Sequence, residues 1–384
     1  MQENQPIYLD YNATTPIAEA VADAMAPFLY KHFGNPSSAH HFGFTAKLAV
    51  ENARKQVAEL LNCQSDEIIF TSSGTESNNL ALRGYALANR QKGNHIITSS
   101  VEHPAVLNVC EYLEKQGFRV TYLPVDSYGW VNPKELRNAL TDDTLLVSVM
   151  HANNEVGTIE PIRELADIAH KAGAVFHTDA AQSVGKILVD LEALGVDLLS
   201  VAGHKLYAPK GVGALFIRQG VPLEKILFGA GQERGLRPGT ENVLEIVGLG
   251  RAAQLAKNES AETLVHMVTL RDRLYQGLEA GLPTGSIQLN GHPEQHLPNT
   301  LNLSFKGVQA NVFLEKIRGH VAASAGAACH ADQVSISSVL KAMDVPLDWA
   351  KGAVRFSVGR QTTVKDIDQA IKKITSSIKE LINE

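Results

Sequence analysis

The sequence predicts an α/β fold in which a mostly parallel sheet lies between helices, together with a smaller α+β domain. Three observations support this prediction. Strand-like and helix-like segments alternate through the first two thirds of the 384 residues. The strand-like runs are continuously apolar, which is typical of strands covered on both faces. The last third combines long amphipathic helices with a few strands, so we expect a second domain there.

The first elements of the large domain follow from apolar spacing. Residues 45–61 have apolar side chains every three or four positions and are predicted to be a helix, as are residues 161–171. Short apolar runs between and around these helices are interpreted as strands of one sheet. These runs are 68–70, 96–97, 145–150, 175–176, 198–199 and 213–217.

The last third opens with a long polar helical stretch over residues 251–280. Strands are predicted at 301–305 and 354–358, and an amphipathic helix covers 364–382. This change in character places the domain boundary near residues 250–265.

The composition excludes several classes of function. A net charge of −6 gives no basic field for nucleic acid, and no apolar run approaches the ~20 residues that a membrane span needs. The first residues are neither basic nor apolar, so we expect no secretory signal. The three widely spaced cysteines form neither a disulfide scaffold nor a CxxC metal pair, which favours a reducing cytoplasm. His32, His40 and His41 fit no strong ligand spacing, so we predict no metal.

Polar residues follow four of the apolar runs. The small residues at 71–76 lead from one run into a helix, where exposed N–H groups suit a phosphate. The other three runs lead to His103, Asp179 and Lys205. Ligands of open α/β sheets lie outside the carboxyl ends of the strands, so we expect these groups to meet.

Pyridoxal phosphate needs this set of groups. Its aldehyde needs an amine, so Lys205 is predicted to hold the cofactor as a Schiff base, and its pyridine nitrogen needs a carboxylate, here Asp179. Its phosphate needs N–H donors, and its ring needs a flat group to stack on. Either charged residue alone would be interpreted as a helix cap or a solvated side chain. The coincidence of four strand ends favours the cofactor site.

Nine segments resemble the cysteine desulfurases, in order from near residue 7 to near residue 368. They are YLDYNATTP (8–16), GNPSS (34–38), GTESNN (74–79), NNEVG (153–157), HTDAAQ (177–182), GHK (203–205), GQER (231–234), RPGTEN (237–242) and RFSVGR (355–360). The resemblance implies a homodimeric pyridoxal-phosphate enzyme of fold type I, in the class V aminotransferase group, with a seven-stranded type of sheet. It implies a large cofactor-binding domain over residues 15–255, and a small domain over 1–14 with 256–384 that carries a catalytic cysteine loop.

The resemblance assigns residues to the cofactor. Lys205 anchors it, Asp179 pairs with the ring nitrogen and His103 stacks on the ring. The other cofactor-binding residues that it implies are Gln182 and Asn154 near the ring hydroxyl, Gly74, Thr75 and His204 at the phosphate, and Thr240 reaching the phosphate of the neighbouring subunit.

The resemblance also assigns the substrate site. Arg355 forms a bidentate pair with the substrate carboxylate, a geometry that lysine cannot match. Asn154, Asn12 and Ala13 lie beside the substrate. One position departs from the family pattern, since Ala202 stands where a serine is frequent. One phosphate contact is therefore missing or supplied elsewhere.

Cys329 decides the reaction. It lies in SAGAACH (324–330), and the small residues before it and polar residues after it predict a mobile exposed loop, where a thiol can be reactive. In the desulfurases the cysteine of the matching segment is the nucleophile. Cys63 and Cys110 are instead interpreted as small buried hydrophobes.

The reaction that the resemblance implies converts L-cysteine to L-alanine. Lys205 removes the α-proton, the Cys329 thiolate takes the sulfur as a persulfide, and His103 moves protons. A sulfur-acceptor protein is then the expected partner. The cysteine loop and Ala202 also resemble the selenocysteine lyases, so L-selenocysteine is the alternative substrate. A class V aminotransferase and a non-catalytic sulfur-transfer scaffold are more distant alternatives.

Overall fold

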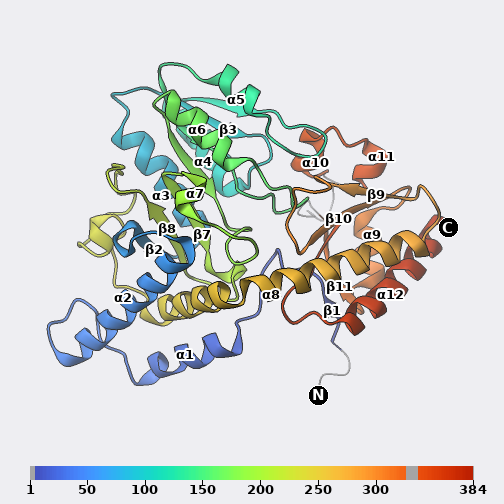
Figure 1. The fold of residues 1–384 in the computed structure, drawn as a ribbon, viewed down its shortest axis with the longest axis horizontal. Helices are drawn as coiled ribbons and strands as arrows, with labels where there is room; N and C mark the ends of the chain where they lie inside the picture. Colours follow the sequence, from blue (N-terminus) through green and yellow to red (C-terminus); the bar gives the residue numbers. More distant parts are fainter. Residues whose placement is uncertain (1–4, 326–335, 384) are drawn as a thin grey trace.

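The computed structural model describes residues 5–325 and 336–383. Its main sheet has seven strands in the order β2-β8-β7-β6-β5-β3-β4 (Figure 1). Neighbouring strands are parallel except at β8, which is antiparallel to both β2 and β7. The strands are β2 (Ile68–Thr71), β3 (His95–Ser99), β4 (Arg119–Leu123), β5 (Thr144–Ser148), β6 (Val175–Asp179), β7 (Leu198–Ala202) and β8 (Gly213–Ile217). The predicted α/β fold with a mostly parallel seven-stranded sheet is confirmed.

The apolar runs did not predict β4. This strand lies at the edge of the sheet and pairs only with β3. Arg119 and Tyr122 are exposed, and Leu123 alone of its five residues is buried. An edge strand with this pattern lacks the continuous apolar run that marks a strand covered on both faces.

Both faces of the main sheet are covered. Its helices are α1 (Glu19–Tyr30), α2 (His41–Leu61), α3 (Gly74–Ala88), α4 (Pro104–Lys115), α5 (Pro133–Ala139), α6 (Ile162–Lys171) and α7 (Leu191–Leu194). Ile97 and Val147 belong to a core with α2 and α6, whereas Ile96 and Leu146 belong to a core with α3 and α4. Successive residues of one strand therefore enter different cores, which explains why the runs are continuously apolar.

Helix α2 begins before the predicted position 45. The ring Nδ1 of His40 accepts a hydrogen bond from the Gly43 backbone N–H and so caps the helix at its start. Among the described residues, no group of three or more His, Cys, Asp and Glu side chains is placed to hold a metal ion.

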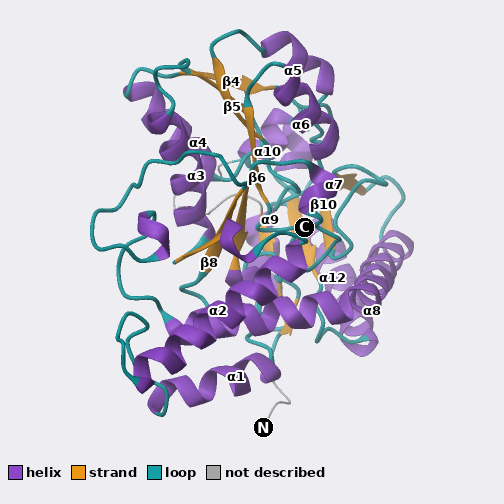
Figure 2. Cartoon of the chain, turned by 60° about the vertical axis from the view of Figure 1, so that its left-hand side comes forward, coloured by secondary structure: helices purple, strands orange, loops and turns teal. Residues whose placement is uncertain are grey.

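A second, antiparallel sheet has four strands in the order β12-β13-β10-β9, and β1 and β11 form a parallel pair. Figure 2 shows β10 of this sheet to the right of β6 and β8 of the main sheet. The strands are β1 (Ile7–Tyr8), β9 (Ile287–Asn290), β10 (Thr300–Phe305), β11 (Val321–Ala322), β12 (Ser324–Ala325) and β13 (Ala353–Ser357). The helices of this part are α9 (Ala310–Ile317), α10 (Ser338–Ala342), α11 (Leu347–Ala350) and α12 (Val364–Asn383).

One long helix, α8 (Val243–Gly281), joins the two parts of the fold (Figure 1). Its first half packs in the main-sheet core through Ile246 and Leu249, and its second half packs beside β10, β13 and α12 through Leu270 and Leu274. The helix begins before the predicted position 251, because the Asn242 side chain accepts a hydrogen bond from the Glu245 N–H. The predicted boundary falls inside this helix, and the division into residues 15–255 and the remainder stays a prediction.

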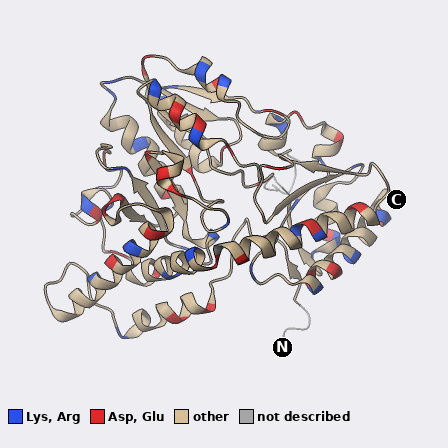
Figure 3. Cartoon of the chain, in the orientation of Figure 1, with Lys and Arg blue, Asp and Glu red and all other residues tan. Residues whose placement is uncertain are grey.

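Charged residues of both signs are mixed along α6, α8 and α12 (Figure 3), the usual pattern of solvated helix faces. Within residues 5–325 and 336–383, every helix is too short or too polar to cross a membrane.

Candidate active site

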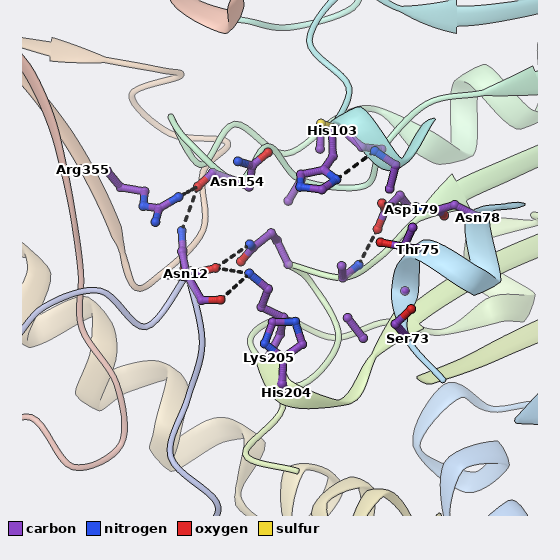
Figure 4. Close-up of a pocket in the computed structure, with 18 residues that line it drawn as sticks. Asn12, Ser73, Thr75, Asn78, His103, Asn154, Asp179, His204, Lys205 and Arg355 are labelled. Carbon is purple, nitrogen blue, oxygen red and sulfur yellow. Dashed lines mark hydrogen bonds between the residues drawn. The ribbon is translucent and has the colours of Figure 1, made fainter. Parts of the chain in front are cut away.

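A cavity of about 400 Å³ lies at the carboxyl ends of β6 and β7, beside β13 (Figure 4). The N-terminal segment, the start of α3, the loops after β3 and β5, and β13 all contribute to its wall. Its lining residues are Asn12, Ala13, Ser73, Gly74, Thr75, Asn78, His103, Ala105, Met150, Ala152, Asn154, Asp179, Ala181, Gln182, Ala202, His204, Lys205 and Arg355.

The cavity contains all the predicted cofactor and substrate residues except Thr240. Thr240 is exposed and lies between the short 3-10 helix Glu233–Gly235 and α8. Cys329 lies outside the described residues. Asn12 and Arg355, which lie far apart in the sequence, therefore line the same cavity. His103, Asp179 and Lys205, which follow strands, also line it, and the sequence led us to expect these three together.

Asp179 ends β6 with its carboxylate at the cavity wall and 6% of its surface exposed. Its Oδ2 accepts a hydrogen bond from Asn78 Nδ2 at 2.7 Å, and its Oδ1 accepts one from the Ala181 N–H at 2.9 Å. The Oδ1 of Asn78 is buried and has no partner among the described residues. Sequence reasoning missed Asn78 as a site residue, although its place four positions after Gly74 puts both on one face of α3.

Lys205 lies in the 3-10 turn after β7 and points toward the N-terminal segment (Figure 4). Its Nζ donates a hydrogen bond to the Ala13 carbonyl oxygen at 2.9 Å and contacts the Asn12 carbonyl oxygen. Burial lowers the pKa of this amine to about 8, and the positive charge of Arg355 acts in the same direction. Roughly a tenth of the amine is therefore unprotonated and nucleophilic at pH 7, far more than for a lysine of ordinary pKa.

The two histidines of the cavity are held as neutral rings. Burial lowers the pKa of His103, against the opposing charge of Asp179, and it lowers the pKa of His204 to about 4; the charge of Lys205 lowers the pKa of both. His103 caps α4, because its Nδ1 accepts a hydrogen bond from the Ala105 N–H at 3.1 Å. In the neutral ring, Nε2 therefore carries the proton.

The start of α3 forms the anion-binding side of the cavity. Ser73 is the N-cap, since its Oγ accepts a hydrogen bond from the Glu76 N–H. The N–H groups of Gly74 and Thr75 precede the first turn of intrahelical bonds and suit a phosphate. A Cβ on Gly74 would lie 3.1 Å from the Cβ of Ala202, so glycine permits the close approach of β7. Ala202, the residue that departs from the family pattern, thus lies against the anion-binding turn.

Arg355 lies on β13, opposite Ser324 of β12, with its side chain 8% exposed. Its Nη1 donates to the Asn154 carbonyl oxygen at 2.8 Å, and its Nη2 pairs with Asp10 Oδ1 at 2.7 Å. Its buried Nε has no partner among the described residues. Sequence reasoning did not assign Asp10 a role, although the residue lies within a quoted motif. A buried guanidinium held on two sides suits recognition of a carboxylate.

The other two cysteines lie outside this cavity. Burial raises the pKa of both Cys63 and Cys110 to about 12, so both are thiols rather than thiolates at neutral pH. Cys110 is fully buried, whereas Cys63 is only partly buried against the main core.

Pyridoxal phosphate fits this set of groups. The cavity offers an amine of lowered pKa, a buried carboxylate, a neutral imidazole and a helix N-terminus around one space. Its volume lies in the range of small-molecule sites. The fold and the site define a pyridoxal-phosphate enzyme of fold type I.

Comparison with known proteins identifies the family. The model of the aminotransferase class-V family matches residues 7–370, and the chain belongs to this family. It is 48% identical to cysteine desulfurase IscS of Methanosarcina thermophila over 382 residues, which are 99% of this chain and 94% of that protein. A solved NifS-like protein superposes with a TM-score of 0.91 and 40% identity, covering 98% of this chain and all of the other. A structure of SspA in complex with cysteine has a TM-score of 0.81 and 34% identity, and covers 93% of this chain and 99% of that one.

Proposed function

We propose that this protein is a pyridoxal-phosphate-dependent cysteine desulfurase, which converts L-cysteine to L-alanine and carries the sulfur as a persulfide on Cys329. The observation that carries the proposal is the cavity that joins the Lys205 amine, the Asp179 carboxylate and the Arg355 guanidinium. The chain's similarity to a named cysteine desulfurase and to a cysteine-bound neighbour supports the choice of substrate.

Lys205, Asp179 and the start of α3 would hold the cofactor. When bound, pyridoxal phosphate supplies an electron sink that lets the substrate α-carbon lose a proton. The Lys205 amine, with its pKa lowered to about 8, would hold the cofactor through its aldehyde and is the base placed to take the substrate α-proton. The Asp179 carboxylate would keep the ring nitrogen protonated. Gly74, Thr75 and His204 would bind the phosphate.

Arg355 would bind the substrate carboxylate and fix the α-carbon near Lys205. Its contacts with Asp10 and the Asn154 carbonyl oxygen hold the guanidinium in place before substrate arrives. Such preorganisation reduces the entropy that binding costs. Asn12 and Ala13 form the wall beside this position. Neutral His103, with its proton on Nε2, would stack on the cofactor ring and could move a proton to or from the substrate.

The sulfur step uses Cys329 as thiolate. An S–S bond forms to the substrate sulfur, and the substrate Cβ–S bond breaks with its electron pair left on carbon, which is then protonated. The net reaction is L-cysteine plus the Cys329 thiol giving L-alanine plus the Cys329 persulfide, so atoms and electrons balance without an added oxidant. The terminal sulfur then passes to a sulfur-acceptor protein.

The test compares wild type with Cys329→Ser and with Cys63→Ser, a control that alters a thiol outside the cavity. Wild type and the control are expected to release alanine from L-cysteine and to gain one sulfur in mass. Cys329→Ser is expected to do neither. Turnover of selenocysteine without cysteine would favour a lyase, and a keto acid product would favour an aminotransferase. Desulfuration that survives in Cys329→Ser would refute the persulfide role.

We further propose a homodimer in which Thr240 reaches the cofactor phosphate of the neighbouring subunit. The exposure of Thr240 and its position outside the cavity of its own chain support this proposal. A dimeric mass in solution and weaker cofactor binding by Thr240→Val would be consistent with it; a monomer with full activity would refute it. A reducing compartment such as the cytoplasm suits a free thiol nucleophile.

A further inference from the structure

A second lysine, Lys186, lies behind the active-site wall. Its side chain is 7% exposed, and its Nζ donates hydrogen bonds to Gln182 Oε1 at 2.7 Å and to Asn12 Oδ1 at 2.8 Å. Both acceptors are neutral amides, and no carboxylate among the described residues pairs with this amine. A lysine that is buried without a carboxylate is costly, so its hydrogen bonds call for an explanation.

The first effect of Lys186 is on the Gln182 amide. The Nε2 of Gln182 donates to the Asn12 carbonyl oxygen at 3.0 Å, while its Oε1 receives the bond from Lys186. A carbonyl oxygen can only accept, and the Lys186 amine donates, so the two contacts together fix which end of the amide is which. The amide nitrogen has a second proton, and Gln182 lines the cavity.

The second effect is on Asn12, which lies between Asn154 and Lys205 in Figure 4. The Oδ1 of Asn12 accepts from Lys186 and from Asn299, and its Nδ2 donates to Thr300 Oγ1 at 2.8 Å. The carbonyl oxygen of Asn12 contacts the Lys205 amine. Lys186 therefore supports the residue whose backbone holds Lys205.

We propose that Lys186 is a positioning residue, which holds the Gln182 amide so that an N–H donates to an oxygen of the bound cofactor. This inference rests on the proposed function, because it concerns the cofactor of that reaction. Without the Lys186 donor, the bond from Gln182 Nε2 to the Asn12 carbonyl oxygen is the one described contact left to oppose a half rotation of the amide. The Gln182 carbonyl would then face the cofactor oxygen, and two acceptors repel each other.

Burial lowers the pKa of Lys186 well below its usual range, and the charges of Lys205 and Arg355 act in the same direction. The amine has N–H donors in either protonation state, and it donates to two oxygen atoms here.

The test uses Lys186→Met, which keeps the length of the side chain and removes its donors. Apoprotein is titrated with pyridoxal phosphate, and the dissociation constant and the visible absorption maximum of the bound cofactor are recorded. We expect about tenfold weaker binding, the scale of one lost hydrogen bond, together with a shifted maximum. Lys171→Met, which alters an exposed lysine at the end of α6, is the control and is expected to match wild type.

A double-mutant cycle tests the route through Gln182. Lys186→Met is expected to weaken binding less in the Gln182→Met background than in wild type, because that background already lacks the amide that Lys186 holds. The effect that remains there reports the contact of Lys186 with Asn12. Full additivity of the two effects would overturn the proposal, as would wild-type binding and spectrum in Lys186→Met. Lys186→Gln, which keeps an N–H donor, is expected to recover part of the affinity and covers the case in which the methionine variant does not fold. Wild-type protein that binds no cofactor would refute the proposed function itself, and the inference with it.

Discussion

The substitution Asp179→Asn separates the chemistry of the cavity from the stability of the fold. The carboxylate accepts one bond from Asn78 at 2.7 Å and one from the Ala181 N–H at 2.9 Å. The new amide oxygen can keep the bond to Ala181. The new amide nitrogen at position 179 would face Asn78 Nδ2, a second donor. Asn78 also has a buried Oδ1 without a partner among the described residues. A half rotation of the Asn78 amide therefore restores a hydrogen bond.

The expected cost in stability is small, because two charge-assisted hydrogen bonds become two neutral ones. That exchange is worth about 1–2 kcal/mol in the free energy of unfolding, offset in part because a buried charge is also removed. The expected cost in turnover is large, since we propose that this carboxylate keeps the cofactor nitrogen protonated. Removal of one preorganised electrostatic partner lowers kcat by about a hundred- to a thousandfold.

Two assays check these values: urea unfolding of the apoprotein, and alanine release from L-cysteine at saturating cofactor. Asp197→Asn is the matched control, because Asp197 is also a buried carboxylate beside β6 and accepts from the Phe176 N–H and from His170. It is expected to reduce stability and to leave turnover per folded molecule unchanged. Wild-type turnover in Asp179→Asn would refute the role of the carboxylate, and a stability loss above about 3 kcal/mol would refute the exchange of bonds with Asn78.

Three further outcomes follow from the site. Arg355→Lys is expected to raise KM for cysteine at least about tenfold in steady-state kinetics, because one ammonium cannot reproduce a bidentate pair; an unchanged KM would place the substrate carboxylate elsewhere. Ala202→Ser adds a hydroxyl against the Gly74 turn and is expected to tighten cofactor binding by about three- to tenfold in an apoprotein titration. Unchanged or weaker binding would count against a phosphate site at the Gly74 turn. The rate of cofactor capture by apoprotein, measured by stopped flow, is expected to rise with pH and to become constant above pH about 8, because the unprotonated Lys205 amine is the nucleophile and its pKa is about 8. A rate that still rises beyond pH 10 would contradict the lowered pKa.

The sequence alone determined the class of fold and the centre of the site. Continuous apolar runs at 68–70 and 198–199 indicated strands covered on both faces, and both faces are indeed packed against helices. Since the carboxyl ends of parallel strands share one edge of a sheet, the sequence alone predicts that the residues that follow these strands lie close together. Asp179 and Lys205 were found in this way. The edge strand β4 was missed, because its mixed burial leaves no such run.

Only the tertiary structure decided how the charges of the site are supported. Asn78 bonds to Asp179, Asp10 to Arg355, and Lys186 to Asn12, and each pair is joined across more than a hundred positions of sequence. Periodicity and motif spacing describe neighbours along one element, so they contain no information about such pairs. Burial also cannot be deduced from sequence spacing, since the pKa of Lys205 is lowered by segments that pack around it after folding. The sequence thus determined which groups reach the cavity, and the packing of distant segments decided their protonation and orientation.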